Sequence, residues 1–193
     1  RGGHQTPQLS SWFPQGLAYI AGTLVAHGHE VEIYSQDFHH FPNEHLTEFL
    51  DANRFDVIGI GVIAGYYQYR RLLQLSDAIN RSKNRPLYIL GGHGPSPEPE
   101  FFLTKSKADI AVLGEGEATV VDLLNALESH RPLSEVLGIA YWKDGRVVVN
   151  DRRPLIQDIE SIPLPAYRLF PINYYRLMRM PHTENSDFVM PVL

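Results

Sequence analysis

The protein has 193 residues, of which 44% are hydrophobic and 20% charged. This is the size and composition of a folded domain with a substantial core. Its 17 Lys and Arg against 22 Asp and Glu give a formal net charge of −5. This negative charge and the lack of a cluster of basic residues argue against nucleic acid as a partner. No apolar run approaches the roughly 20 residues that span a bilayer, and no secretion signal is visible, so we expect a cytoplasmic protein without membrane contact.

The sequence contains no cysteine. This excludes disulfides and thiol catalysis within these residues. It also excludes an iron–sulfur cluster or zinc ion held by cysteines of this chain.

Apolar periodicity predicts helices and strands that alternate along the chain. The predicted helices cover residues 15–27, 43–53, 69–80, 97–106 and 118–129. The predicted strands cover residues 29–34, 56–63, 87–90 and 110–113. Gly28 is placed to end the first helix and Asn43 to cap the second. The nearly continuous apolar run at 56–63 is typical of a central strand that is buried on both faces.

This alternation predicts a doubly wound parallel α/β sheet of the flavodoxin-like or Rossmann-like class. The flavodoxin-like strand order needs a central strand before the first helix, but the sequence opens with a loop at residues 1–7. We therefore expect the first strand to be missing and the natural protein to begin several residues upstream.

Two alternating apolar segments, 138–142 and 146–150, flank Lys143-Asp144-Gly145 and predict a β-hairpin. Pro-rich sequence without periodicity then runs to Leu193, which is typical of a linker. The expected organisation is an α/β domain at 1–135, the hairpin at 136–150 and the linker at 151–193.

Ligands of doubly wound sheets bind beyond the carboxyl ends of the strands, where this chain has three glycine-rich loops. Glycines let the backbone approach a ligand closely, so three such loops together predict a broad binding floor, although each glycine alone could simply make a turn. The candidate binding residues are Gly61, Val62, Ile63, Ala64, Gly65, Gly91, Gly92, His93, Gly94, Gly114, Glu115, Gly116 and Glu117.

The loops match neither a dinucleotide nor an ATP fingerprint. Glu115 and Glu117 precede a helix, where acidic groups favour the helix dipole and disfavour a phosphate; Glu117 could equally cap that helix. His93 is a candidate ligand contact or a loop histidine bonded to backbone. The histidines at 39, 40 and 45 lack the spacing of a metal site, so no metal ligand is predicted.

Four segments stand out together: 14–19, 56–60, 91–93 with the later Pro99-Glu100, and 108–117. They resemble the cobalamin-binding domain at the N-terminus of cobalamin-dependent radical SAM enzymes, in particular the anaerobic magnesium-protoporphyrin monomethyl ester cyclase and class B methyltransferase group. The resemblance spans roughly residues 3–193, and Gly-Glu-Gly-Glu at 114–117 with its preceding strand is its most specific part. Residues 162–167 resemble the linker before the radical SAM barrel.

The resemblance implies that the cobalamin nucleotide tail enters a groove lined by the loops at Gly61, Gly91 and Gly114, and that the corrin lies across the carboxyl edge of the sheet. It also implies a radical SAM barrel C-terminal to Leu193. That barrel would hold S-adenosylmethionine and a [4Fe-4S] cluster on three cysteines, so the present chain would not be catalytic alone.

Two departures from the wider cobalamin-binding pattern matter. The Asp-x-His at Asp37 follows the wrong strand, and His4 lies in the expected loop without the accompanying Asp and Gly, so cobalamin is expected without a protein histidine ligand. Gly61 stands where many such folds place a Ser that hydrogen-bonds the nucleotide base. A pocket that has lost cobalamin therefore stays open as an alternative.

The leading hypothesis is a cobalamin-binding module of a radical SAM enzyme that transfers a methyl group or oxidatively cyclises or remodels its substrate. One alternative is a cobalamin-free docking or substrate-recognition domain of such an enzyme. Another is a stand-alone flavodoxin-like module for a different small molecule. Under the leading hypothesis a bulky residue at Gly92 should abolish cobalamin binding without unfolding the protein.

Overall fold

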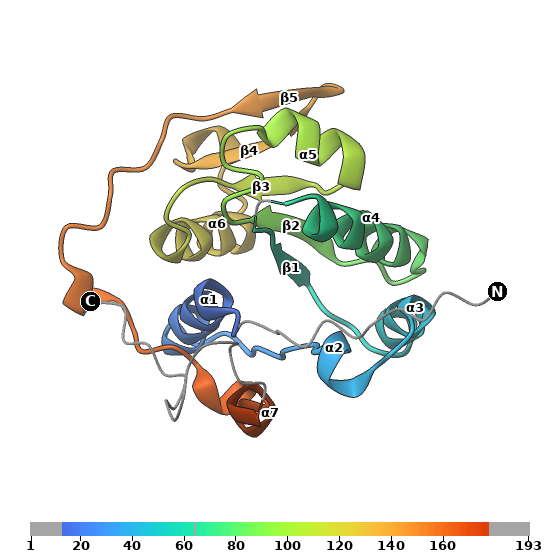
Figure 1. Cartoon of the computed structure of the whole chain (residues 1–193). Helices are drawn as coiled ribbons and strands as arrows, with labels where there is room; N and C mark the ends of the chain where they lie inside the picture. Colours follow the sequence, from blue (N-terminus) through green and yellow to red (C-terminus); the bar gives the residue numbers. More distant parts are fainter. Residues whose placement is uncertain (1–12, 64, 178–193) are drawn as a thin grey trace.

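The computed structural model describes residues 13–63 and 65–177, in which five strands form one sheet covered by helices on both faces (Figure 1). The strands are β1 (Val57–Gly61), β2 (Leu87–Gly91), β3 (Ile110–Val112), β4 (Ile139–Lys143) and β5 (Arg146–Val149). The α-helices are α1 (Gln15–Ala26), α2 (Gln36–His39), α3 (Asn43–Ala52), α4 (Tyr66–Arg81), α5 (Pro99–Ser106), α6 (Glu117–Glu128) and α7 (Ile172–Leu177). Three short 3-10 helices cover Leu133–Glu135, Ile159–Ser161 and Tyr167–Leu169.

The sheet has the order β1-β2-β3-β4-β5. The first three strands are parallel, and the β4–β5 hairpin continues the sheet antiparallel to β3. The hairpin turn places Asp144 and Gly145 at φ 49° and 76°, the positive values that Asp-Gly favours in a two-residue turn. The predicted α/β class and hairpin are confirmed.

Two hydrophobic clusters hold the layers together. Leu90 and Ala111 lie in the cluster beneath α3, α4 and α5, whereas Ile89 and Ile110 lie in the one beneath α6. This alternation follows from the period of two along a strand. Helix α1 packs beside α6 and therefore lies on the same side of the sheet (Figure 1).

The predicted strand at 29–34 is wrong. Residues 30–34 form no strand and make no backbone hydrogen bond with another described residue, although the side chains of Val31, Ile33 and Tyr34 are half-buried. A strand exists only by pairing, and no described strand lies next to this segment to pair with it.

Strand β1 is shorter than predicted and is not central. It pairs with β2 on one side only, so within the described part of the chain it is an edge strand, and Gly59 and Gly61 are exposed. The apolar run at 56–63 correctly predicted a strand, but the prediction that this strand is buried on both faces is wrong for the described residues, because no residue of β1 is fully buried and one edge of the strand has no described neighbour.

Helix boundaries also differ in detail. Helix α4 begins at Tyr66, three residues earlier than predicted, and α2 replaces part of a predicted loop. Asn43 does not cap α3: it is the first helical residue, and its Oδ1 accepts hydrogen bonds from Gln36 and Arg71 instead. Gly28 ends α1 as predicted, with φ 86°.

After the hairpin, residues 151–170 form a segment, called the strap here, that crosses to α1. The Ala166 amide donates to the Ala18 carbonyl oxygen at 2.9 Å, so the strap bonds directly to the helix backbone. A Cβ atom on Gly22 would lie 2.2 Å from the Leu164 carbonyl oxygen. The contact therefore depends on the glycine, and the strap is a docked segment over this stretch.

Candidate functional site

The loops after β1, β2 and β3 lie side by side because the parallel strands end in register. Gly61 pairs with Gly91 at the ends of β1 and β2. Beyond them, the Val62 amide donates to the Gly91 carbonyl oxygen at 2.8 Å, and the Gly94 amide donates to the Val62 carbonyl oxygen at 3.0 Å. The first two loops thus lie side by side at the carboxyl edge, as predicted, and the structure adds that backbone hydrogen bonds join them.

Ser96 joins the second and third loops and was missed in the sequence. Its hydroxyl donates to the Gly92 carbonyl oxygen at 2.9 Å and accepts from the Gly114 amide at 3.0 Å. The signal available was a small hydroxyl residue directly after Gly-His-Gly-Pro, a type that bonds backbone groups in loops. Ser96 therefore fixes the spacing of the loops.

Three glycines form a side-chain-free lane on the sheet face that carries α1 and α6. Val57 packs into the cluster beneath α6. Gly59 and Gly61 follow it by two and four residues, so they face the same side of the sheet because side chains alternate along a strand. Gly91 lies opposite Gly61. A Cβ atom on Gly59 or Gly61 would meet no heavy atom of residues 13–63 and 65–177 within 4 Å. We call Gly59, Gly61 and Gly91 the glycine floor; Gly59 was not among the predicted site residues.

Gly92 and Gly94 serve a different purpose from the glycine floor. Gly92 has φ 94°, and a Cβ there would lie 2.7 Å from the Val62 carbonyl oxygen. A Cβ on Gly94 would lie 3.0 Å from Cγ1 of Val62. Both glycines permit the close approach of two loops, so a bulky residue at Gly92 would strain the loop itself rather than only block a ligand.

The remaining predicted residues divide into backbone and surface positions. The Val62 side chain is buried in the core, so only its backbone belongs to the loop surface. Gly65 has φ 144° and precedes α4, and Gly114 has φ 73°. Ile63 is exposed beside the glycine floor. Ala64 and His4 lie outside the described residues.

The two acidic residues of the third loop, Glu115 and Glu117, have different surroundings. Glu115 Oε2 accepts a hydrogen bond from the Ile156 amide at 2.6 Å, so this carboxylate anchors the strap. Glu117 is the first residue of α6 and follows the N-cap residue Gly116, and among the described residues no side chain caps this end of the helix with a hydrogen bond from the N-cap position. Gly116 lies against Ile20 of α1, whose Cδ1 would be 2.8 Å from a Cβ there. The third loop thus touches both the strap and α1.

A second anchor holds the strap to α6. Asp122 accepts hydrogen bonds from Arg131 and from Arg153 of the strap, and Arg153 also donates to the Thr119 hydroxyl. Burial by itself would raise the pKa of Asp122, but the hydrogen bonds and charges of the two arginines outweigh it and hold the pKa below its ordinary value. Asp122 therefore stays ionised and fixes the start of the strap.

The histidines are dispersed. His93 is exposed and makes no hydrogen bond or ion pair with the described residues. His45 Nδ1 lies 2.8 Å from the Tyr34 hydroxyl, and its ring stacks on Phe41 with centroids 3.8 Å apart. Across residues 13–63 and 65–177, no three His, Asp or Glu side chains are grouped as metal ligands. His45 thus has an aromatic packing role.

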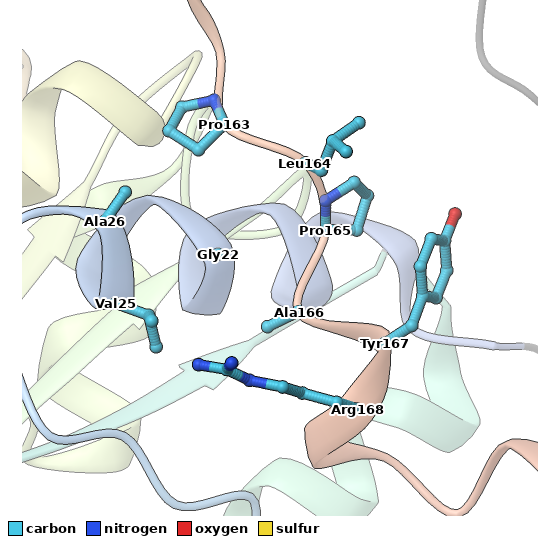
Figure 2. A pocket seen from close by; sticks show the side chains of 9 residues that line it. All are labelled: Gly22, Val25, Ala26, Pro163, Leu164, Pro165, Ala166, Tyr167 and Arg168. Atoms are coloured by element: carbon cyan, nitrogen blue, oxygen red, sulfur yellow. The ribbon is translucent and has the colours of Figure 1, made fainter.

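A groove of about 370 Å³ lies away from the loops, between α1 and the strap. Figure 2 shows Pro163, Leu164 and Pro165 along α1, and Arg168 reaching back toward Val25. None of the glycine-loop residues lines this groove. It results from an extended segment lying across a helix and is separate from the candidate site.

Comparison with known proteins gives a consistent result. A family model described as the B12 binding domain matches residues 9–124. An uncharacterized methyltransferase of Pyrococcus horikoshii is 29% identical over 170 residues, which are 87% of this chain and 36% of that protein. The anaerobic magnesium-protoporphyrin IX monomethyl ester cyclase of Synechocystis sp. is 30% identical over 148 residues, 76% of this chain and 30% of the cyclase.

Solved structures share the fold. The cobalamin-dependent S-adenosylmethionine radical enzyme OxsB, with aqua-cobalamin and S-adenosylmethionine bound, matches with a TM-score of 0.65 and 23% identity over 82% of this chain and 22% of OxsB. The radical S-adenosylmethionine methyltransferase TsrM from Kitasatospora setae, with cobalamin and a [4Fe-4S] cluster bound, matches with a TM-score of 0.60 and 18% identity over 79% of this chain and 28% of TsrM. The chain spans between 28% and 41% of the length of the curated relatives.

The described helices include none that is both long and apolar enough to cross a membrane.

Proposed function

Because this chain belongs to the family of B12 binding domains, we propose that it is the cobalamin-binding module of a radical SAM enzyme that transfers a methyl group or oxidatively remodels its substrate. The chain is related to cobalamin-dependent radical SAM methyltransferases and to the magnesium-protoporphyrin cyclase. The activity of the whole enzyme, its substrate and its cytoplasmic location are part of the proposal.

The observation that carries the proposal is the glycine floor. Among the described residues, a Cβ at Gly59 or Gly61 would have no neighbour within 4 Å, so this part of the structure offers room for a ligand on the α1 and α6 side of the sheet. A flat nucleotide base needs an uninterrupted surface on which to lie, and glycines provide it. The residues present therefore fit the nucleotide tail of cobalamin.

The chain's own residues would bind and orient the cofactor. Two backbone hydrogen bonds join Val62 of the first loop to Gly91 and Gly94 of the second loop. Ser96 bonds the second loop to the third and so fixes the spacing between them. A preformed floor binds with a smaller loss of conformational entropy than a flexible one. When bound, cobalamin supplies a cobalt centre that can carry a methyl group.

No protein histidine is proposed below cobalt. The exposed His93 follows β2, and its side chain is not held in a fixed orientation by any described neighbour. S-adenosylmethionine and the [4Fe-4S] cluster would belong to a barrel C-terminal to Leu193, since this chain has no cysteine to hold a cluster.

The test is to mix the purified protein with hydroxocobalamin, desalt it and record the visible spectrum. We expect about one retained chromophore per chain, and an EPR spectrum of the Co(II) form without splitting from a protein nitrogen. Gly61→Val should weaken cobalamin binding at least about tenfold, because its side chain fills the floor, while circular dichroism stays unchanged. Gly16→Ala, at another open glycine on α1, should bind as the wild type.

A folded wild-type protein that stays colourless would contradict the proposal for this chain. It would favour the cobalamin-free docking or recognition domain, to which the replacement of a base-bonding Ser by Gly61 also points. Equal cobalamin affinity of the wild type and Gly61→Val would remove the glycine floor from the binding site.

A further inference from the structure

The strap and the third loop of the candidate site are joined directly. Glu115 of that loop accepts a hydrogen bond from the Ile156 amide at 2.6 Å, and the strap then runs on to α1, where the Ala166 amide bonds to Ala18 (Figure 1). Glu115 is exposed and follows Gly114 at the carboxyl edge of the sheet. A carboxylate at the edge of the site thus bonds a segment 41 residues further along the chain.

A series of hydrogen bonds leads from this carboxylate to the glycine floor. Gly114, the residue before Glu115, donates its amide hydrogen to the Ser96 hydroxyl, and that hydroxyl donates to the Gly92 carbonyl oxygen. Gly92 directly follows Gly91 of the glycine floor. The position of Glu115 therefore depends on the same backbone that would surround a ligand.

The strap is held at its two ends and not in its middle. Among the described residues, positions 157–163 form hydrogen bonds only with other residues of the strap. Leu155, Ile159 and Leu164 keep 66%, 68% and 87% of their surface accessible. Segments with few buried contacts open locally at a small cost in free energy, so a docked and an open strap are both accessible. The bond to Glu115 is one of the contacts that favour the docked state.

A ligand on the glycine floor should favour the docked strap. The bound ligand would restrict the three loops, including the one that carries Glu115. A strap amide that bonds an already restricted loop causes a smaller loss of conformational entropy than one that bonds a mobile loop. By linkage, the docked strap must raise the affinity for the ligand by the same factor.

We propose that Glu115 is a positioning residue that couples occupation of the glycine floor to docking of the strap. The ligand stabilises the docked strap, and the docked strap holds the third loop in the conformation that binds the ligand. This inference rests on the proposed function and adds how the same site is regulated. It gives Glu115 a role through the strap in place of the cofactor contact expected from the sequence.

Hydrogen exchange measured by mass spectrometry tests the coupling. The full chain is compared without ligand and at saturation with hydroxocobalamin, so that a variant with weaker binding is also measured fully loaded. In the wild type, saturation should slow exchange in peptides from 151–166 about fivefold. Helix α3 lies on the opposite face of the sheet, and its exchange should change by less than about twofold.

Variants of Glu115 show whether this carboxylate carries the effect. In Glu115→Ala the protection of the strap by the ligand should fall below about twofold, because the acceptor is gone. Glu115→Gln keeps an oxygen that can accept from the Ile156 amide, so it should retain at least about threefold protection. The matched control is Glu160→Ala, which removes an exposed carboxylate of the strap itself and should leave the protection at about fivefold.

A double-mutant cycle on hydroxocobalamin affinity identifies the contact. Ile156→Pro removes the amide donor without altering the third loop, and Ile156→Ala, which keeps the amide, is its control. Glu115→Ala and Ile156→Pro should each weaken binding about fivefold, and Ile156→Ala should bind within about twofold of the wild type. The double variant should be about fivefold weaker rather than about 25-fold, because both changes remove the same bond. Ile156→Pro also replaces Glu115→Ala in the exchange experiment if circular dichroism shows that the alanine variant is unfolded.

Three results would overturn the inference while the proposed function stands. Hydroxocobalamin could bind the wild type without slowing exchange in the strap, which would make the ligand and the strap independent. The strap could be protected equally in the wild type and in Glu115→Ala, which would assign the coupling to another contact. The effects of Glu115→Ala and Ile156→Pro on affinity could multiply, which would mean that Glu115 acts without the strap. If the folded wild type binds no hydroxocobalamin, the proposed function fails and the inference fails with it.

Discussion

Tyr88 shows how one polar residue is accommodated in the core. Its side chain is fully buried in β2, and its hydroxyl lies 2.8 Å from the hydroxyl of Ser76 on α4, which is also buried. Burial raises the pKa of Tyr88 to about 12, and the hydrogen bond with Ser76 opposes this rise. The pair ties β2 to α4 beneath the helices that position the second loop.

Removing the Tyr88 hydroxyl should destabilise the protein. Tyr88→Phe leaves the Ser76 hydroxyl buried without this partner, so we expect the free energy of unfolding to fall by about 1–2 kcal/mol in urea denaturation. Adding Ser76→Ala should recover part of the loss. Tyr66→Phe, which removes an exposed hydroxyl, is the control and should be neutral within about 0.5 kcal/mol.

The same residue predicts a dependence on alkaline pH. The folded pKa of about 12 exceeds the unfolded value of 10.0, so the folded protein binds this proton more tightly. Its contribution is complete below the unfolded pKa and is lost as pH rises toward the folded value. The stability difference between wild type and Tyr88→Phe should therefore shrink between these two pH values. A difference that is constant up to pH 12 would contradict the assignment.

Two kinds of glycine that look alike in the sequence have different surroundings in the structure. Where a side chain would stand, Gly61 has no described neighbour within 4 Å, whereas Gly92 lies against the Val62 backbone. Both occur in glycine-rich loops after strands, so composition predicted the loops but not which glycine faces a ligand. That distinction depends on the neighbouring strand.

At the scale of elements, the docking of the strap on α1 depends on Gly22. Gly22→Ala would place its Cβ 2.2 Å from the Leu164 carbonyl oxygen, so the strap or the helix must shift. We expect a loss of about 1–3 kcal/mol in unfolding free energy, in spite of the higher helix propensity of alanine. Limited proteolysis should also cut the strap faster.

Gly16→Ala provides the matched comparison on the same helix. A Cβ on Gly16 would meet no atom of the described residues within 4 Å, so alanine should stabilise the protein by a few tenths to about 1 kcal/mol. Equal effects of the two substitutions would show that the strap does not press on α1 in solution.

The elements whose own apolar pattern was strong were predicted well. Helices α3 and α6 and strands β2 and β3 agree with the sequence to within a few residues. The segment at 29–34 has the alternation of a strand but forms none, because an extended segment becomes a strand only through a partner. Asn43 likewise has the chemistry of a cap, but Gln36 and Arg71 engage its side chain.

At the scale of the whole molecule, the sheet should not be equally stable across its width. Strand β2 has a strand on either side, β1 has a described neighbour on one side only, and residues 30–34 make no backbone hydrogen bond with the described residues. Amide hydrogen exchange should therefore be slowest in β2, faster in β1 and fastest at 30–34, after correction for intrinsic rates. Protection at 30–34 equal to that of β2 would mean that this segment is paired as a strand.

The sequence by itself determined the α/β class, the hairpin and the position of the three loops, because periodicity and turn residues are local properties of the chain. Its motifs also pointed to the cobalamin-binding family. Only the tertiary structure decided that β1 is an edge in the described chain, that Ser96 joins two loops, that Glu115 anchors the strap and that Gly59 belongs to the floor. Each of these depends on which residues meet across the sheet, and such contacts between distant segments are set by packing rather than by local pattern.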